Sequence, residues 1–239
     1  MRKFKEYLVG GAVRDEILGL SNKDLDYVFV FEDLDENQTA EECFNEMYQN
    51  IQDRGEIFLS TPSCYTIRYK DRETKEVKDV VMARKEVGYI PGTRTPIVKP
   101  GTLYDDLERR DATLNALAKD EDGTIIDYFN GLTHLKYGIL RTPLDPIKTF
   151  DDDALRIIRF IRFSITKGFT IPGDIDRVIQ KYDYDNKMGT VSTERIREEL
   201  FKCFKHNTLL TLWQLNCFPN LRDYIFKNNL LWLKPTMEQ

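Results

Sequence analysis

Runs of aromatic and β-branched residues recur through the first half of the chain and predict short strands. The clearest run is DLDYVFVF at residues 24–31, and similar runs lie at residues 6–10, 56–60, 64–70, 77–83 and 124–128. Helical patterning is found at residues 12–18, 40–53 and 103–118, and the first of these helices is expected to end at Gly19. From about residue 150 onward the pattern predicts helices. We therefore expect an α/β N-terminal part and an all-α part, joined near Pro143 and Pro146.

Residues 88–102 interrupt this pattern. They hold three glycines and three prolines, and they are too many for a simple connection. We expect a loop that acts as a lid or a binding loop.

Composition narrows the class of protein. The 239 residues are 41% hydrophobic, which indicates a globular chain without an apolar run long enough to span a membrane. The basic start has no apolar segment after it, so no signal peptide is expected. Four widely spaced cysteines and two histidines argue against zinc and favour a cytoplasmic location. The net charge of −5 argues mildly against a nucleic-acid partner, although carboxylates that bind metal ions would also lower it.

Two glycines, Gly10 and Gly11, form a turn between the first expected strand and the first expected helix, and Arg14 lies in the first turn of that helix. Glycines there let backbone N–H groups approach an anion, the helix N-terminus adds its positive end, and Arg14 can fork onto a phosphate. Further on, Asp24 and Asp26 alternate along a strand, so both carboxylates project from one face. Such a pair can share two divalent cations that activate a hydroxyl and steady a leaving pyrophosphate. A lone DxD is weak, but cradle and pair in this order are specific.

A second polar segment is RRDATLNAL at residues 109–117. Arg110, Asp111, Thr113 and Asn115 offer donors and acceptors suited to a ribose and a triphosphate. A solvated, charged helix start has the same composition, and the residues alone do not separate the two interpretations.

A third segment is DDDALRIIRF at residues 151–160. On a helical wheel Asp152, Asp153, Arg156 and Arg159 fall within about 120° of one another, opposite an apolar side. This polar edge can pair with the Watson–Crick edge of a base. An i,i+3 salt bridge on an amphipathic helix is the commoner meaning of the pattern.

A fourth segment, TERIREEL at residues 193–200, predicts a helix with Thr193 as its N-cap and Arg195 in its first turn. A charged surface helix is the alternative interpretation.

In this order the four segments resemble the class II tRNA nucleotidyltransferase and bacterial poly(A) polymerase family of the polymerase β superfamily. LVGGAVRDEILGLSNKDLDYVF resembles the nucleotidyltransfer signature, and RRDATLNAL resembles the ribose-recognition motif. DYFNGLTHLKYGILR is similar to the link between head and neck. DDDALRIIRFIRF resembles the amino-acid template helix, and TERIREEL resembles the helix that buttresses it. The resemblance runs from about residue 7 to residue 205.

The resemblance implies an α+β fold class. Residues 1–140 would form a polymerase β-like nucleotidyltransferase head with a small mixed sheet and helices, and residues 141–239 a helical neck and truncated body. It also implies a cytoplasmic enzyme that binds RNA, above all the tRNA 3′ end, and that does not bind a membrane. Its substrates would be CTP and ATP, and its cofactor two Mg²⁺ ions.

The resemblance also implies roles for single residues. The implied metal ligands are Asp24 and Asp26, and Asp79, in the expected strand 77–83, is a candidate third catalytic carboxylate. The implied nucleotide-binding residues are Gly10, Gly11, Arg14, Arg110, Asp111, Asn115, Asp153, Arg156, Arg159 and Arg195. Of these, Asp153 and Arg156 would pair with the incoming base.

The chain departs from the family pattern in places. Asp152 stands where the template motif usually has Glu, and Ala112 where the ribose motif usually has Phe. Residues 88–102 lack the Asp-to-Arg spacing of loops in CCA-adding members. The leading hypothesis is a CCA-adding enzyme of reduced size. The alternatives are a poly(A) polymerase, an enzyme that adds only C or only A, a non-catalytic RNA-binding or regulatory protein, and an enzyme that transfers a nucleotide to a protein. The oligomeric state stays open.

Overall fold

The computed structural model describes residues 3–21, 24–34, 37–89 and 96–231. The chain divides into two compact units, Met1–Leu132 and Thr133–Gln239. Each unit is described by itself.

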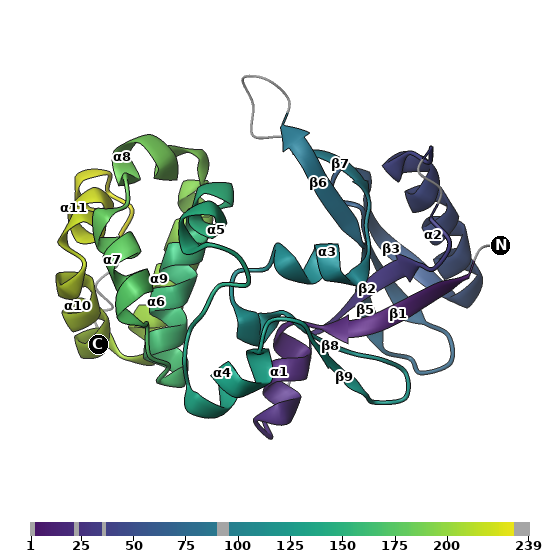
Figure 1. Ribbon diagram of the computed structural model, residues 1–239, viewed down its shortest axis with the longest axis horizontal. Helices are drawn as coiled ribbons and strands as arrows, with labels where there is room; N and C mark the ends of the chain where they lie inside the picture. The colour runs from purple at the N-terminus through teal and green to yellow at the C-terminus, as the bar shows by residue number, and fades with distance from the viewer. Residues whose placement is uncertain (1–2, 22–23, 35–36, 90–95, 232–239) are drawn as a thin grey trace, which may run out of the picture. The chain divides into compact units, whose positions relative to one another are not determined.

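The described part of the first unit contains a seven-stranded mixed sheet in the order β3-β4-β5-β2-β1-β8-β9 (Figure 1). Its strands are β1 (Phe4–Val9), β2 (Leu25–Phe31), β3 (Gly55–Thr61), β4 (Thr66–Asp71), β5 (Val77–Met82), β8 (Leu117–Lys119) and β9 (Ile125–Asp127). Strands β2 and β5 are parallel, and the other neighbours are antiparallel. The unit also contains α1 (Gly11–Ile17), α2 (Ala40–Arg54), α3 (Leu103–Glu108) and the 3-10 turns η1 (Pro62–Cys64) and η2 (Thr113–Asn115).

The alternation of side chains along β2 divides the core into two layers. Phe29 and Phe31 pack with α2 on one face of the sheet. Val28 points to the other face and packs with Leu103 and Leu107 of α3. Because side chains alternate along a strand, Asp26 shares the α3 face with Val28. The hydrophobic pattern of β2 therefore decides on which face the carboxylate lies.

Two predictions for this unit are wrong in part. The helix expected at residues 103–118 ends at Glu108, and the chain continues through η2 into β8, where Leu117 and Ala118 are fully buried in the sheet. Tertiary pairing with β1 overrides the local helical pattern there. Part of the loop expected at residues 88–102 is strand, because β7 (Pro96–Pro100) and the end of β6 (Arg84–Tyr89) lie within it and pair with each other, with a register shift at Gly88. Their prolines stand at the ends of β7, where strands tolerate them. Residues 90–95 of this expected loop lie outside the described residues.

The second unit is built from helices, with an isolated bridge between Ile139 and Thr170. The helices, α4 beginning at the end of the first unit, are α4 (Gly131–Tyr137), α5 (Pro146–Asp152), α6 (Leu155–Lys167), α7 (Gly173–Lys181), α8 (Tyr184–Lys187), α9 (Thr193–His206), α10 (Thr208–Cys217) and α11 (Pro219–Lys227), with the 3-10 turn η3 (Met188–Thr190). At the centre of this unit the Phe150 and Phe160 rings meet edge to face at 5.4 Å, and both are fully buried. The expected fold class, a mixed sheet with helices followed by a helical part, is confirmed.

Two local predictions for the second unit are wrong. Asp152 and Asp153 do not share one helix with Arg156, because α5 ends at Asp152 and Asp153 is extended, with φ −152° and ψ 104°. The Asp153 side chain instead accepts a hydrogen bond from the Leu155 N–H at 3.1 Å, as aspartates do at helix starts. Likewise Ser192, not Thr193, caps α9, with its hydroxyl accepting from the Arg195 N–H at 3.4 Å.

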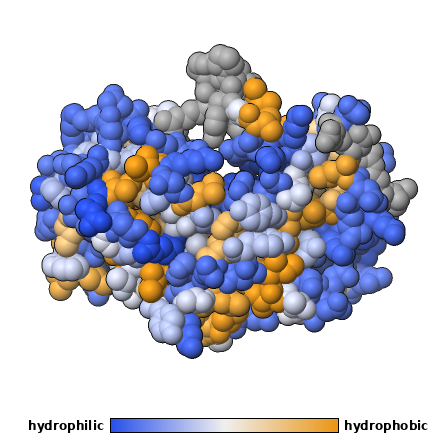
Figure 2. Space-filling model, in the orientation of Figure 1, coloured by the Kyte–Doolittle hydropathy of each residue, from blue (hydrophilic) through white to orange (hydrophobic). Residues whose placement is uncertain are grey.

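On the face shown in Figure 2 the coloured surface is mainly hydrophilic, with hydrophobic side chains in patches. Among the described residues, the helices are too short or too polar for any of them to cross a membrane.

Candidate functional site

Asp24 and Asp26 lie at the start of β2, with Asp24 directly before the strand. Asp26 is in parallel register with Asp79 of β5, so the two carboxylates are neighbours on the α3 face. Burial raises the pKa of Asp26 above its ordinary value of 3.8, the Arg110 guanidinium opposes this, and the Asp79 and Asp24 carboxylates raise the pKa further. A carboxylate between two others is a position that a bound cation stabilises.

Asp79 forms an ion pair with Arg68. Arg68 of β4 donates to it from Nε at 2.6 Å and from Nη2 at 2.5 Å. Within the described residues, the acidic, histidine and cysteine side chains form no group of three or more that could hold a metal ion. The pair Asp24 and Asp26 still fits Mg²⁺, because that ion is commonly held by one or two carboxylates together with substrate phosphates and water.

Gly10 brings the glycine turn against the second polar segment. Its backbone has φ +71°, and a Cβ built on it would lie 2.8 Å from Nη1 of Arg110. The missing side chain therefore makes room for the Arg110 guanidinium, which also donates to the backbone oxygen of Asn115 at 3.4 Å. Gly11, the next residue, begins α1.

Arg14, Asn115 and Asp111 form one chain of buried hydrogen bonds. Arg14 Nη1 donates to Asn115 Oδ1 at 2.5 Å, and Asn115 Nδ2 donates to Asp111 Oδ1 at 2.8 Å. All three residues are less than 9% exposed, and Arg14 also forks onto Asp15 with two bonds of 2.9 Å. Buried polar groups with satisfied partners form rigid networks. The structure thus brings the first and second predicted segments into one polar site within the first unit.

Asp106 is a functional candidate that the motif analysis did not include. It is fully buried and accepts from Arg109 at 2.5 and 3.1 Å and from Arg110 at 2.9 and 3.3 Å. Burial raises the pKa of Asp106, but Arg110 and Arg109 outweigh it and hold the pKa below 3.8. Its spacing of three and four residues from the two arginines was the available signal in the sequence.

In the second unit, Asp153 and Arg195 form an ion pair of 2.9 Å between the α5–α6 junction and the first turn of α9. Arg156 is oriented separately, since its Nη1 donates to the backbone oxygen of Thr149 at 2.9 Å. Arg195 therefore contacts the residue that the sequence predicts to face the base, while Arg156 lies on the adjoining turn of α6.

Arg159 lies one turn further along α6, near a buried carboxylate of α9. Its Nη1 is 4.0 Å from Glu199 Oε1, and Glu199 also accepts from Arg162 and, at 3.1 Å, from Lys202. Burial raises the pKa of Glu199, but Arg162 and Arg159 lower it more. Glu199 is thus a second residue that the motif analysis left without a role.

Known proteins resemble this chain in sequence and in fold. Residues 6–141 match the family described as the poly A polymerase head domain. The multifunctional CCA protein of Nitrosomonas eutropha is 34% identical over 198 residues, which cover 82% of this chain and 43% of that protein.

Two solved structures are similar as well. The Bacillus stearothermophilus CCA-adding enzyme in complex with CTP is 28% identical, with a TM-score of 0.67 over 85% of this chain and 45% of that one. The Thermotoga maritima CCA-adding enzyme complexed with tRNA is 26% identical, with a TM-score of 0.70 over 98% of this chain and 50% of that one. The chain thus spans about half the length of the proteins that it matches.

Proposed function

The chain belongs to the poly A polymerase head domain family, and on that premise we propose that it adds nucleotides to an RNA 3′ end without a nucleic-acid template. The substrates are CTP and ATP, and the RNA is the 3′ end of tRNA. The names of the relatives, which are CCA-adding enzymes or multifunctional CCA proteins, support this choice. Residues 1–140 carry the transfer reaction, and residues 141–239 select the base and contact RNA.

One observation carries the proposal: Arg110 joins the three parts of the first-unit site. It lies against Gly10, it is ion-paired with Asp106 at 2.9 Å, and its charge opposes the rise in the pKa of Asp26 that burial causes. The glycine turn, the ribose segment and the carboxylate pair therefore form one electrostatic unit. Such a unit suits a ligand that carries a triphosphate, a ribose and a reacting phosphorus atom.

In the proposed reaction, the RNA 3′-hydroxyl oxygen attacks the α-phosphorus of the nucleotide, and the bond to pyrophosphate breaks. Gly10, Gly11 and Arg14 hold the triphosphate, and Arg110 and Asp111 hold the ribose. Asn115 accepts a hydrogen bond from Arg14 and donates one to Asp111, and in this way it keeps Arg14 in place. Because these groups are already hydrogen-bonded to one another, little reorganisation is needed when the nucleotide binds.

We propose that two magnesium ions bind, and Asp24 and Asp26 would hold them. Bound there, Mg²⁺ would favour deprotonation of the attacking hydroxyl and neutralise charge on the leaving pyrophosphate. Asp79 stays a candidate catalytic carboxylate, and Arg68 fixes its position.

Base selection is assigned to the second unit. Asp153 accepts from the exocyclic amino group that cytosine and adenine share, and Arg156 donates to the adjacent ring nitrogen. Arg195 orients Asp153 through its ion pair, and Arg159 completes the basic edge of α6. Uracil and guanine present a carbonyl and a ring N–H in those places, which leaves buried donors and acceptors unmatched.

The experiment that tests the function supplies Mg²⁺, one labelled nucleotide at a time, and tRNA ending at the discriminator base, at C or at CC. We expect C to be added to the first two RNAs and A to the third. A poly(A) polymerase, the second candidate because of the family's own description, would extend any RNA 3′ end with many A residues. Incorporation of A into an unrelated RNA oligonucleotide, with no C added to tRNA, would select that alternative.

A further inference from the structure

A groove of about 370 Å³ lies along α7 in the second unit. Ile147 of α5, Val178 of α7 and Tyr182 line it, so that much of its wall is apolar. Ile147 is 52% exposed, although burial of an isoleucine side chain is favourable. The volume falls within the range of about 300–1,000 Å³ that is usual for small-molecule sites.

The charged residues of this groove differ in whether they have a partner. Asp174 is paired with Arg141 at 2.5 Å, and Lys187 with Asp151 at 2.7 Å. Asp183 accepts from the N–H and the side chain of Asn186.

Arg177 and Lys181 are exposed, and neither has an ion pair or hydrogen bond among the described residues. They stand four residues apart on α7, with Val178 between them. Side chains at this spacing lie about 5–6 Å apart at their Cβ atoms, so both can reach one anionic group.

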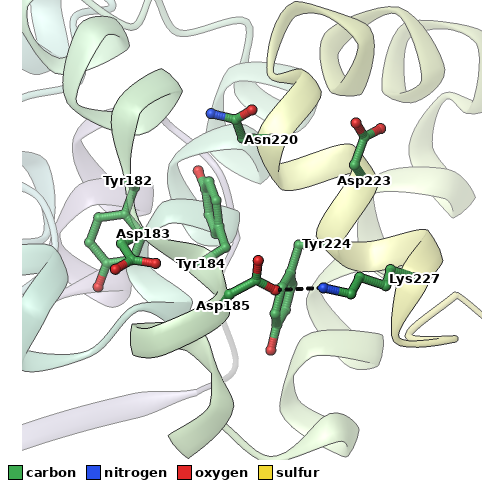
Figure 3. Close-up of a pocket in the computed structure, with 8 residues that line it drawn as sticks. All are labelled: Tyr182, Asp183, Tyr184, Asp185, Asn220, Asp223, Tyr224 and Lys227. Carbon is green, nitrogen blue, oxygen red and sulfur yellow. Dashed lines mark hydrogen bonds and ion pairs between the residues drawn. The ribbon is translucent and has the colours of Figure 1, made fainter.

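A neighbouring pocket of about 360 Å³ shares Tyr182 and Asp183 with the groove but has the opposite charge. Asp185 and Asp223 line it, and Lys227, its one cation among the described lining residues, is already paired with Asp185 at 3.3 Å (Figure 3). An anion is therefore repelled there and attracted to the groove beside it.

We propose that the α7 groove binds one nucleotide of the RNA substrate through residues that take no part in nucleotidyl transfer. The base covers Ile147 and Val178, and the phosphate lies between Arg177 and Lys181. Apolar contact for a base beside two cations for a phosphate matches the two halves of a nucleotide. This inference rests on the proposed function, because RNA is the polyanion that the proposed reaction brings to the protein.

The test measures RNA binding by the whole chain in the absence of nucleoside triphosphates. The variant R177Q/K181Q is compared with K136Q/K205Q, which removes the same charge from exposed lysines of the second unit that do not line the groove. Fluorescence anisotropy of a labelled tRNA gives the Kd at several salt concentrations. We expect R177Q/K181Q to raise the Kd about tenfold and to lower the slope of log K against log salt by about 1–2, with less than a twofold change in the control.

Equal effects of the two double variants would overturn the proposal. The proposal would also fail if wild type bound labelled polyglutamate and R177Q/K181Q lost that binding but still bound tRNA. The partner of the groove would then be an acidic protein. A third variant, V178N, tests the apolar wall without changing the charge, and we expect it also to weaken tRNA binding. The proposed function is judged separately: if wild type binds tRNA through the groove but adds no nucleotide to it, that function fails and the groove assignment stands.

Discussion

Arg14 donates a hydrogen bond of 2.5 Å to the side chain of Asn115, which lies 101 residues further along the chain. This bond is buried, and it connects the glycine turn with the ribose segment. Neither motif contains the whole of the proposed nucleotide site, so the bond is the point at which two separate sequence signals become one structure.

The first prediction concerns this bond. Asn115→Ala removes the Oδ1 that accepts from Arg14 and the Nδ2 that donates to Asp111, so each of these two buried side chains loses a hydrogen bond. We expect the free energy of unfolding to fall by about 1–3 kcal/mol and the KM for CTP to rise about tenfold or more. Thermal unfolding and steady-state kinetics measure the two effects. A variant with unchanged KM would remove Asn115 from the nucleotide site.

The second prediction uses two glycines with positive φ. Gly10→Ala places a methyl group 2.8 Å from Arg110, whereas a Cβ on Gly19, with φ +68°, meets nothing within 4 Å. Both substitutions strain the backbone and cost about 1–3 kcal/mol of stability. Only Gly10→Ala displaces Arg110, so only that variant should raise the KM for CTP, by about tenfold or more. Equal KM values would show that the approach of Arg110 to Gly10 does not matter for binding.

The third prediction concerns the pH dependence of stability. The pKa of Asp106 is lower in the folded protein than its ordinary value of 3.8, because Arg110 and Arg109 outweigh its burial. Its stabilising contribution is therefore complete above that value and is lost as the pH falls through the lower folded pKa.

Asp106→Asn should accordingly lower the free energy of unfolding by about 3–5 kcal/mol near neutral pH, since two guanidiniums lose their buried carboxylate. The difference between wild type and variant should shrink below about pH 4. Urea denaturation at several pH values measures it. A difference that stays constant at low pH would contradict the assignment of the ion pair as its cause.

The fourth prediction separates the base-selecting residue from the residue that orients it. Asp153→Ala should reduce the preference for CTP over UTP by about 10–100-fold, with a smaller loss of kcat at saturating CTP. Arg195→Ala should act in the same direction but more weakly, because Asp153 stays and loses only its 2.9 Å partner. The measurement is kcat/KM for each nucleotide. An unchanged preference in Asp153→Ala would leave the structural ion pair as the function of Asp153.

The sequence allowed the first-unit site to be predicted where the signal is local. Alternation along residues 24–31 is enough to place Asp24 and Asp26 on one face, and the structure puts Asp26 on the α3 side with Val28. Asp106 was missed because its spacing to Arg109 and Arg110 is just as common on solvated helices. Only its burial under the sheet makes that pairing strong, and burial depends on contacts distant in sequence.

The break at Asp153 shows another limit. Hydrophobic periodicity continues through residues 151–163, so the helical pattern alone gives no signal that α5 ends and α6 begins. The break arises because the Asp153 side chain competes for a backbone N–H, a local interaction that period counting does not detect. The same competition separates Asp152 from the polar edge that the helical wheel had assigned to it.

The central claim, that the first-unit site transfers nucleotides to RNA, is tested most directly by adding labelled CTP and Mg²⁺ to tRNA that lacks its CCA end. Wild type, Asp24→Asn and Asp26→Asn are compared, with circular dichroism as the control for folding. The account predicts C addition by wild type and a loss of at least about 10³-fold in each variant, since removal of a metal-binding carboxylate should cost several kcal/mol of transition-state stabilisation. Folded variants that add C at the wild-type rate would contradict it.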